Sequence, residues 1–555
     1  MTKNIRFSNL DRKKTVAKLT EELFDLVVIG GGITGGGIAL DAASRGLKVA
    51  LVEKNDFASG TSSKSTKLIH GGLRYLKQFD FWLVKEVGSE RAIVHNLAPH
   101  LVLPEKMLLP LIENGSYGKW LTSIGLKVYD ILAQVTGDDK RKMLEKKEAL
   151  KLEPLLPKKI LKGAGYYAEY RTDDARLTME TIKTSLHHGA MALNYAEVKD
   201  FIYEEDLVAG VKVKDTVSDS EFLIRSKYVI SAAGPWVDDL RGINNSKKGK
   251  RLHLTKGVHL VFPYEKLPIK QSVYFDIPDG RMMFAIPRGK ITYIGTTDTN
   301  FNENKDDVKT DVADAIYLIS AVNNMFPKIN LEMEDIISSW AGLRPLIHEE
   351  GKSASELSRK DEIFTSDTGL ISIAGGKLTG YRKMAERVVN RVAKKLEEDY
   401  EVVVKPSDTE NIPLCGNEFK KYKYVKKYIT EIHERLTPEG FSQYDAWYLV
   451  TNYGKQTETI LKYYAKQKDN DHELGMAKAE LKFAIENEMV QTPMDFFIRR
   501  TGRLYFDIDS IRKLMEPLLA EFKIIFKLED EVINSYRATL EEQMEVHSNF
   551  SLHRI

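Results

Sequence analysis

The segment that most constrains the fold of this chain is a glycine-rich turn between a short apolar strand and a helix. Residues 26–29 are a β-branched apolar run, typical of a buried parallel strand. Gly30, Gly32 and Gly35 follow with the spacing G-x-G-x-x-G. In this motif the backbone turns tightly at the first glycine, approaches a pyrophosphate at the second, and lets helix and strand touch at the third. The N–H groups of the helix then face the anion.

An acidic residue at the end of the next strand strengthens this interpretation. Residues 48–53 form a second apolar strand that ends at Glu53, where a carboxylate would meet a ribose hydroxyl. A carboxylate disfavours a phosphorylated ribose, so the pattern argues against NADP. The alternative is a purely structural glycine turn. The strand, helix and acid together favour dinucleotide binding.

Length and charge exclude several classes of protein. A chain of 555 residues predicts two or three domains. The net charge is +2, from 82 basic and 80 acidic residues, which argues against a dedicated nucleic-acid partner. Cys415 is the only cysteine, so no intrachain disulfide, CxxC pair or cysteine-based metal site is expected. We therefore expect no metal and a reducing, cytoplasmic location.

The sequence contains no signal for membrane insertion but leaves membrane contact open. The first 24 residues lack the apolar region of a secretory signal, and no 18-residue apolar run is present. Residues 120–135 have the apolar spacing of an amphipathic helix and precede a lysine-rich stretch, 140–159. Such a helix either packs on the protein's own core or lies on a membrane. Peripheral association with the inner face of the cell membrane is thus compatible with the sequence.

Two further strand ends carry glycines, and the pattern divides the chain into three parts. One strand stops at Gly234 and Pro235, and residues 370–380 repeat the order strand, glycines, helix. Alternating apolar segments between 250 and 350 indicate an antiparallel sheet. Beyond about 415 the sequence is helical, charged and nearly free of glycine motifs. We predict a discontinuous cofactor domain (20–100, 165–245 and 355–400), a substrate domain (101–164 and 246–354) and a helical C-terminal domain (410–555) without chemistry of its own.

Seven motifs in order carry a resemblance to a known family. They are GGGITG at 30–35, SKSTKLIHGGLRY at 63–75, AGPW at 233–236, KGVH at 256–259, TTD at 296–298, GLRPL at 342–346 and GGKLT at 375–379. Across about residues 20–400 the chain resembles the FAD-dependent glycerol-3-phosphate dehydrogenases. The stretch MDFFIRRT at 494–501 is similar to the helical C-terminal domain of that family.

The resemblance implies a fold and an activity. The fold is that of flavoenzymes of the D-amino-acid oxidase type: a Rossmann-like FAD domain, an antiparallel substrate domain and a helical C-terminal domain. The activity is oxidation of sn-glycerol 3-phosphate at C2 to dihydroxyacetone phosphate by hydride transfer to FAD. Electrons then pass to a membrane quinone or, in a related subgroup, to dioxygen with release of hydrogen peroxide.

The same resemblance assigns cofactor contacts. Gly30, Gly32 and Gly35 become the pyrophosphate turn of FAD, with Glu53 at the ribose. Lys64, Ser65 and Thr379 are expected to contact FAD, and His70 to lie against the flavin ring. The helix that follows Gly376 would stabilise the anionic reduced flavin. Val198, through its backbone, and Gly234 complete the expected cofactor set.

Basic residues within the motifs suit a phosphorylated substrate. A phosphate dianion needs guanidinium or ammonium groups in fixed geometry. Arg74, Arg344, Arg359 and Lys377 lie in or beside the motifs and are the candidate phosphate ligands. The alternative for each is an ion pair that anchors a loop. Tyr75 either hydrogen-bonds substrate or only packs.

Loss of hydride from C2 requires that the C2 hydroxyl proton also leave, so a base is needed. His259 is our candidate, and its ordinary pKa leaves it mostly neutral at pH 7. Arg344 and Lys377 complete the expected catalytic set. His70 is the rival base, and a core histidine bonded to backbone is the structural alternative for His259.

Other functions are compatible with parts of the sequence. The chain could be a glycerol-3-phosphate oxidase, although no long insert typical of that subgroup is present. It could also be an amine oxidase, but several basic candidates fit a phosphate better than a single carboxylate. A nucleotide-sensing or assembly protein with a vestigial FAD site is disfavoured by the intact basic set. A homodimer is compatible with the sequence.

Overall fold

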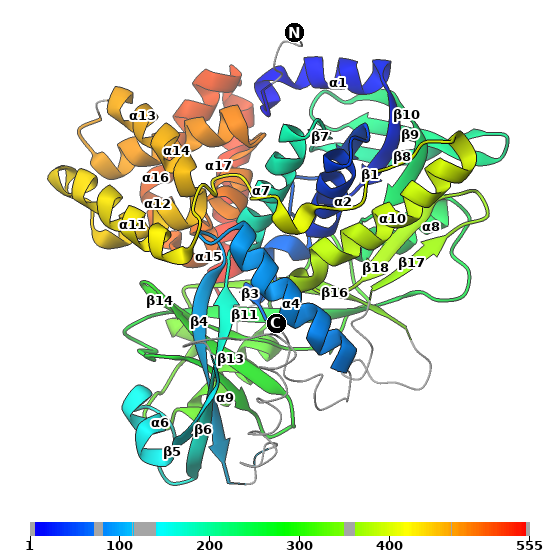
Figure 1. The fold of residues 1–555 in the computed structure, drawn as a ribbon. Coiled ribbons are helices and arrows are strands. Elements are labelled where there is room, and N and C mark those ends of the chain that lie inside the picture. The colour runs from blue at the N-terminus through cyan, green and yellow to red at the C-terminus, as the bar shows by residue number, and fades with distance from the viewer. Residues whose placement is uncertain are drawn as a thin grey trace.

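The computed structural model describes residues 6–70, 81–113, 115, 140–348, 361–467 and 469–550. Its described part contains two sheets and a group of C-terminal helices (Figure 1). In Figure 1 the first sheet lies at the upper right, the C-terminal helices at the upper left and the second sheet below them. Arg74, Tyr75, Arg359 and the amphipathic segment 120–135 lie outside the described residues.

The first sheet follows from the apolar strands that the glycine motifs terminate. Its described strands have the order β17-β18-β10-β1-β2-β7, and β9 joins β8 to β10. The four central pairings, from β18 to β7, are parallel, and β17, β9 and β8 pair antiparallel. The strands are β1 (Leu23–Ile29), β2 (Val49–Val52), β7 (Met191–Leu193), β8 (Ala196–Glu204), β9 (Leu207–Asp215), β10 (Ser220–Ser231), β17 (Asp361–Thr365) and β18 (Ile371–Gly375).

Helices cover this sheet and bury its apolar strands. Helix α2 (Ile33–Ser44) packs between α7 (Asp174–His187) and α10 (Tyr381–Tyr400). Helix α7 begins at Asp174 because the Asp173 carboxylate caps it by accepting the Arg176 N–H at 3.0 Å. Three shorter or peripheral helices complete this part: α1 (Arg12–Glu21), α4 (Phe81–Leu97) and α8 (Val237–Ile243).

The second sheet contains the alternating segments expected between 250 and 350. Its described strands have the order β15-β11-β14-β13-β12-β4-β6-β3, with β16 beside β11 and β5 beside β6. All pairings are antiparallel except that of β12 with β4, which is parallel. The strands are β3 (Leu68–Ile69), β4 (Leu103–Ile112), β5 (Lys142–Glu145), β6 (Leu161–Arg171), β11 (Leu252–Pro263), β12 (Ser272–Asp276), β13 (Met282–Arg288), β14 (Ile291–Gly295), β15 (Thr299–Asn300) and β16 (Ser338–Ile347). Helices α6 (Lys146–Leu152) and α9 (Val312–Met325) pack against it.

The C-terminal helices form a core of their own and share a second one with the sheet. Helices α11 to α14 enclose one apolar cluster, whereas α14 to α17 pack with Trp340 of β16 and Tyr293 of β14. The helices are α11 (Tyr422–Leu436), α12 (Gln443–Tyr453), α13 (Thr457–Gln467), α14 (His472–Asn487), α15 (Arg503–Phe506), α16 (Ile508–Phe526) and α17 (Asp530–Ser548). A π-helical segment, Asp495–Arg500, precedes α15.

The predicted fold class is confirmed: a Rossmann-like α/β part, a mainly antiparallel sheet and a helical C-terminal part. The domain boundaries stay a prediction, and β6 runs across the one placed at residue 164/165. None of the described helices is long and apolar enough to cross a membrane.

Candidate functional site

A cavity of about 360 Å³ lies where the two sheets meet, and the glycine motifs line it. Segments that are far apart in the chain form its wall, from the turn after β1 to the turn after β18. It brings together twelve of the predicted site residues: Gly30, Gly32, Glu53, Lys64, Ser65, His70, Val198, Gly234, Arg344, Gly376, Lys377 and Thr379. Apart from Gly35, the predicted cofactor and substrate groups that the structure describes therefore meet in one place.

The turn after β1 has the geometry that a dinucleotide requires. Gly30 has φ +114°, and a Cβ there would lie 2.6 Å from the Ala232 carbonyl oxygen. A Cβ on Gly35 would lie 1.8 Å from the Gly30 carbonyl oxygen, so strand and helix touch at this point. Gly32 caps α2 and leaves the helix N-terminus open to the cavity. These residues fit the pyrophosphate of a dinucleotide, since N–H groups at a helix start attract anions.

Glu53 lies at the cavity wall and also braces the glycine turn. Its Oε2 accepts the Gly31 N–H at 2.7 Å, and its Oε1 accepts the Asn55 N–H at 2.9 Å. Burial raises the pKa of Glu53, although both backbone hydrogen bonds oppose the shift. Each carboxylate oxygen keeps a further lone pair, so a ribose hydroxyl can still donate to it.

The turn after β18 lines another part of the cavity. Gly376 has φ +81°, and a Cβ there would lie 2.4 Å from the Met384 sulfur. The Thr379 hydroxyl accepts the His70 N–H at 3.1 Å and donates to the His70 carbonyl at 3.2 Å. These bonds fix His70 beside Lys377 and Thr379 on one wall of the cavity. The sequence places a helix N-terminus directly after Gly376. In the structure a short 3-10 turn, Leu378–Gly380, comes first, and α10 begins after it.

Arg344 is held at the cavity by a cage of polar groups. Its Nη2 donates to the Thr296 hydroxyl at 2.8 Å, and its Nη1 donates to the Thr297 carbonyl at 3.0 Å. The Asp298 carboxylate lies 3.3 Å from Nη1. The guanidinium lies directly over Gly257, where a Cβ would be 2.2 Å from Nη2. Such a fixed cation suits a phosphate oxygen.

Lys64 and Ser65 lie in the hydroxyl-rich loop between β2 and β3. Burial lowers the pKa of Lys64 to about 8, and the charge of Arg499 acts in the same direction. The Ser65 N–H donates to Asp174 at 2.9 Å, and its carbonyl accepts the Trp340 indole N–H at 3.0 Å. The loop backbone is therefore fixed from two sides.

His259 does not reach the cavity wall. It is 1% exposed, and its ring stacks on Trp340 with centroids 4.8 Å apart. Its Nε2 lies 3.0 Å from the Thr66 hydroxyl, which does line the cavity. Burial, then the charges of Arg344 and Lys67, hold the pKa of His259 well below its ordinary value. The structure thus places Thr66 between this histidine and the cavity.

The sequence did not assign roles to three residues that line the cavity. Ser62 accepts the Ile33 N–H at 2.9 Å, Thr66 contacts His259, and the Trp236 ring lies under the Lys54 ammonium at 4.4 Å. The sequence features that could have identified them are the hydroxyl-rich stretch 59–66, which contains Ser62 and Thr66, and the AGPW motif, which contains Trp236. Among the described residues no group of three or more metal-binding side chains occurs.

Comparisons with known proteins agree with this geometry. A family model described as FAD dependent oxidoreductase matches residues 25–382. A second, described as the C-terminal domain of alpha-glycerophosphate oxidase, matches residues 407–531. The aerobic glycerol-3-phosphate dehydrogenase of Bacillus subtilis (strain 168) is 49% identical over 540 residues, which is 97% of each chain. That of Staphylococcus aureus (strain USA300) is 48% identical over 507 residues, which is 91% of each chain.

Solved structures show the same relationship. The glycerol-3-phosphate dehydrogenase from Bacillus halodurans, crystallised with FAD, superposes with a TM-score of 0.84 at 42% identity and covers 98% of this chain and 99% of its own. The L-alpha-glycerophosphate oxidase of Mycoplasma pneumoniae shares the fold, with a TM-score of 0.54 at 20% identity, over 70% of this chain and 98% of its own.

Fold, cavity and relatives define the class as FAD-dependent oxidoreductases, and FAD is the cofactor. Within that class, the chain belongs to the family of FAD-dependent, aerobic glycerol-3-phosphate dehydrogenases. The predicted resemblance, cofactor and enzyme class are confirmed.

Proposed function

We propose that this chain oxidises sn-glycerol 3-phosphate at C2 to dihydroxyacetone phosphate, with hydride transfer to FAD and a membrane quinone as the electron acceptor. The observation that carries the proposal is that Arg344, Lys377 and His70 line the same cavity as the glycine turn. The relatives named aerobic glycerol-3-phosphate dehydrogenase support the same substrate.

The cationic groups bind and orient the substrate. The Arg344 guanidinium, held by Thr296 and Thr297, takes the phosphate oxygens, and Lys377 adds a second positive charge. Because the Arg344 guanidinium is already held in place, little of its conformational entropy is lost when the phosphate binds. Arg74, Tyr75 and Arg359 stay predicted members of the same site.

FAD supplies the two-electron acceptor for the hydride that leaves C2. The proton of the C2 hydroxyl needs a separate acceptor, and two histidines compete for this role. His70 lies in the cavity wall, whereas His259 is buried behind Thr66, where an imidazolium would be costly. We therefore favour His70 as the base and infer that His259 is a positioning residue that orients the Thr66 hydroxyl.

Anaerobic reduction tests the substrate directly. The purified yellow protein is expected to bleach when glycerol 3-phosphate is added without oxygen, and not with glycerol. Replacement of Arg344→Gln should raise KM for glycerol 3-phosphate about 10- to 100-fold, since charged hydrogen bonds are worth about 1.5–3 kcal/mol each. The matched control is Arg391→Gln, an exposed arginine on α10. Equal KM values for the two variants would contradict the phosphate role of Arg344.

A second candidate is a glycerol-3-phosphate oxidase. The observation that favours it is the C-terminal match to the domain described for alpha-glycerophosphate oxidase. Reoxidation of the reduced protein separates the two: the quinone-linked enzyme reacts faster with a soluble quinone than with oxygen. Fast oxygen uptake that catalase reduces by half would favour the oxidase instead. Binding to vesicles of anionic lipid tests the predicted peripheral membrane association.

A further inference from the structure

The loop from Glu53 to Lys67, called here the cofactor loop, lines the FAD cavity along most of its length. Its lining residues are Glu53, Lys54, Ser59, Gly60, Thr61, Ser62, Lys64, Ser65 and Thr66. In its described length, regular structure is limited to a 3-10 turn, Thr61–Ser63. Contacts from outside the loop therefore help to set its shape.

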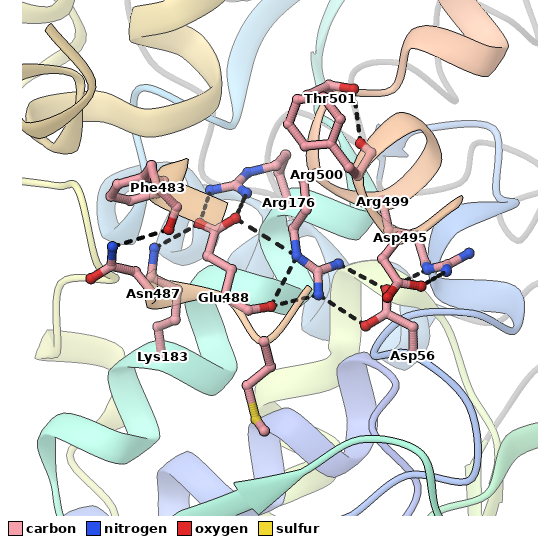
Figure 2. A network of polar contacts seen from close by, with 12 residues as sticks. Asp56, Arg176, Lys183, Phe483, Asn487, Glu488, Asp495, Arg499, Arg500 and Thr501 are labelled. Atoms are coloured by element: carbon pink, nitrogen blue, oxygen red, sulfur yellow. Dashed lines mark hydrogen bonds and ion pairs between the residues drawn. The ribbon is translucent and has the colours of Figure 1, made fainter. Parts of the chain in front are cut away.

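Asp56, near the start of the cofactor loop, is bound by two arginines of the C-terminal part. The Arg500 guanidinium donates to both oxygens of Asp56, at 2.9 Å each, and Arg499 Nε donates at 2.5 Å (Figure 2). The Asp56 and Arg500 side chains are both fully buried. Burial alone would raise the pKa of Asp56, but Arg500 and Arg499 outweigh it and hold that pKa below its ordinary value.

The residues after Asp56 transmit this contact to the glycine turn. The Ala58 N–H donates to the Gly31 carbonyl at 3.0 Å. A Cβ on Gly31 would lie 2.5 Å from the Phe57 ring, so the Phe57 side chain packs directly on the turn. A shift of Asp56 would therefore move the backbone that faces the pyrophosphate.

The far end of the cofactor loop is covered by the same C-terminal segment. The Lys67 ammonium pairs with Asp174 at 2.5 Å and lies 5.5 Å from the Tyr505 ring and 5.6 Å from the Phe506 ring. Tyr505 also packs on Trp340, whose indole holds the Ser65 carbonyl. Residues 495–506 thus contact both ends of the loop.

A second set of buried charges fixes this C-terminal segment to the α/β part. Glu488 accepts two hydrogen bonds from Arg176, at 2.7 and 2.9 Å, and one from Lys183 at 2.9 Å (Figure 2). The Glu488 carbonyl accepts from Arg500 Nη2 at 2.6 Å. Arg500 therefore stands between the anchor on α7 and the cofactor loop.

We propose that Arg499 and Arg500 are positioning residues for FAD: they hold the cofactor loop in its binding shape and couple FAD binding to the docking of residues 488–506. The C-terminal part then completes the cofactor site without touching FAD. By linkage, FAD must stabilise the docked segment as much as the docked segment stabilises FAD binding. This inference rests on FAD as the cofactor and not on the proposed substrate, so its failure is distinct from a failure of the proposed function.

The rate at which the holoenzyme releases FAD tests the proposal. Arg500→Lys keeps the charge but loses the two-pronged bond to Asp56. We expect it to release FAD at least about fivefold faster, the lower end of typical coupling between sites. The matched control is Arg435→Lys, which loses a two-pronged pair with Glu458 between α11 and α13, outside residues 488–506. Only Arg500→Lys should release FAD faster. Equal release rates would overturn the proposal.

Hydrogen exchange on the unmodified protein provides a test that needs no variant. Saturation of the FAD-depleted protein with FAD should slow amide exchange in residues 488–506. Helix α11, in the same C-terminal part but distant from the loop, should exchange at the same rate with and without FAD. If exchange in residues 488–506 does not respond to FAD, the coupling does not exist.

Discussion

The pKa of the Lys64 ammonium is expected to respond to bound FAD. This ammonium lies in the cavity wall, where burial, Arg499 and the opposing charge of Asp307 together leave its pKa at about 8. At pH 7 the group is charged, and at pH 9 it is mostly neutral. A bound pyrophosphate would favour the charged form and raise this pKa.

The affinity for FAD is therefore expected to depend on pH through Lys64. Below pH 8 the ammonium is charged before FAD binds, so affinity is at its maximum. Above pH 8, binding must also protonate Lys64, and affinity falls until the raised pKa of the complex is reached. Titration of FAD-depleted protein between pH 7 and 10 measures this slope, and Lys64→Met should remove it. A slope that persists in Lys64→Met would assign the effect to another group.

At the scale of elements, the register of β11 against β16 positions Arg344 at the cavity wall. Gly257 pairs with Gly342, and Thr255 pairs with Arg344, so the Arg344 side chain can fold back over the bare backbone of Gly257. The sequence identified Arg344 and both glycines as motif residues. It could not show that the guanidinium lies over Gly257, because that depends on pairing between residues more than 80 positions apart.

The substitution Gly257→Ala tests whether the position of the Arg344 guanidinium over Gly257 matters for substrate binding. Its Cβ would lie 2.2 Å from Arg344 Nη2, so the guanidinium must leave its cage of threonine oxygens. We expect KM for glycerol 3-phosphate to rise about tenfold, as for loss of one charged hydrogen bond, with an unchanged flavin absorption spectrum. Gly242→Ala in α8 is the matched control, since nothing lies within 4 Å of its Cβ. A normal KM for Gly257→Ala would show that the guanidinium can bind phosphate from another position.

Local patterns predicted the strand ends and the glycine turns because the turn chemistry resides in adjacent residues. The same reasoning could not place His259, since the KGVH motif does not reveal that the ring stacks on Trp340, 81 residues later, behind Thr66. Nor could it reveal the Asp56–Arg500 pair, whose partners are separated by 444 residues. Contacts of this range depend on how whole elements pack.

At the scale of the whole molecule, the C-terminal part shares a core with the second sheet. Tyr505 and Phe506 of the predicted helical domain pack on Trp340 of β16 in this core. His547 of α17 lies 2.7 Å from the Ser339 carbonyl of β16, the strand that carries Arg344. The strand that carries Arg344 is therefore supported partly by α17.

Removal of residues 407–555 should consequently prevent folding of the remainder. The truncated chain would expose Trp340, which is fully buried in the whole chain, and would leave Arg176 and Lys183 without Glu488. Breaking a buried ion pair costs about 3–5 kcal/mol, which is a large share of a typical stability of about 5–15 kcal/mol. We expect aggregation in gel filtration and no cooperative melt by circular dichroism. Co-expression of residues 407–555 as a separate chain should restore a monodisperse protein and a cooperative melt. A truncated protein that is monodisperse and melts cooperatively by itself would show that the shared core is dispensable.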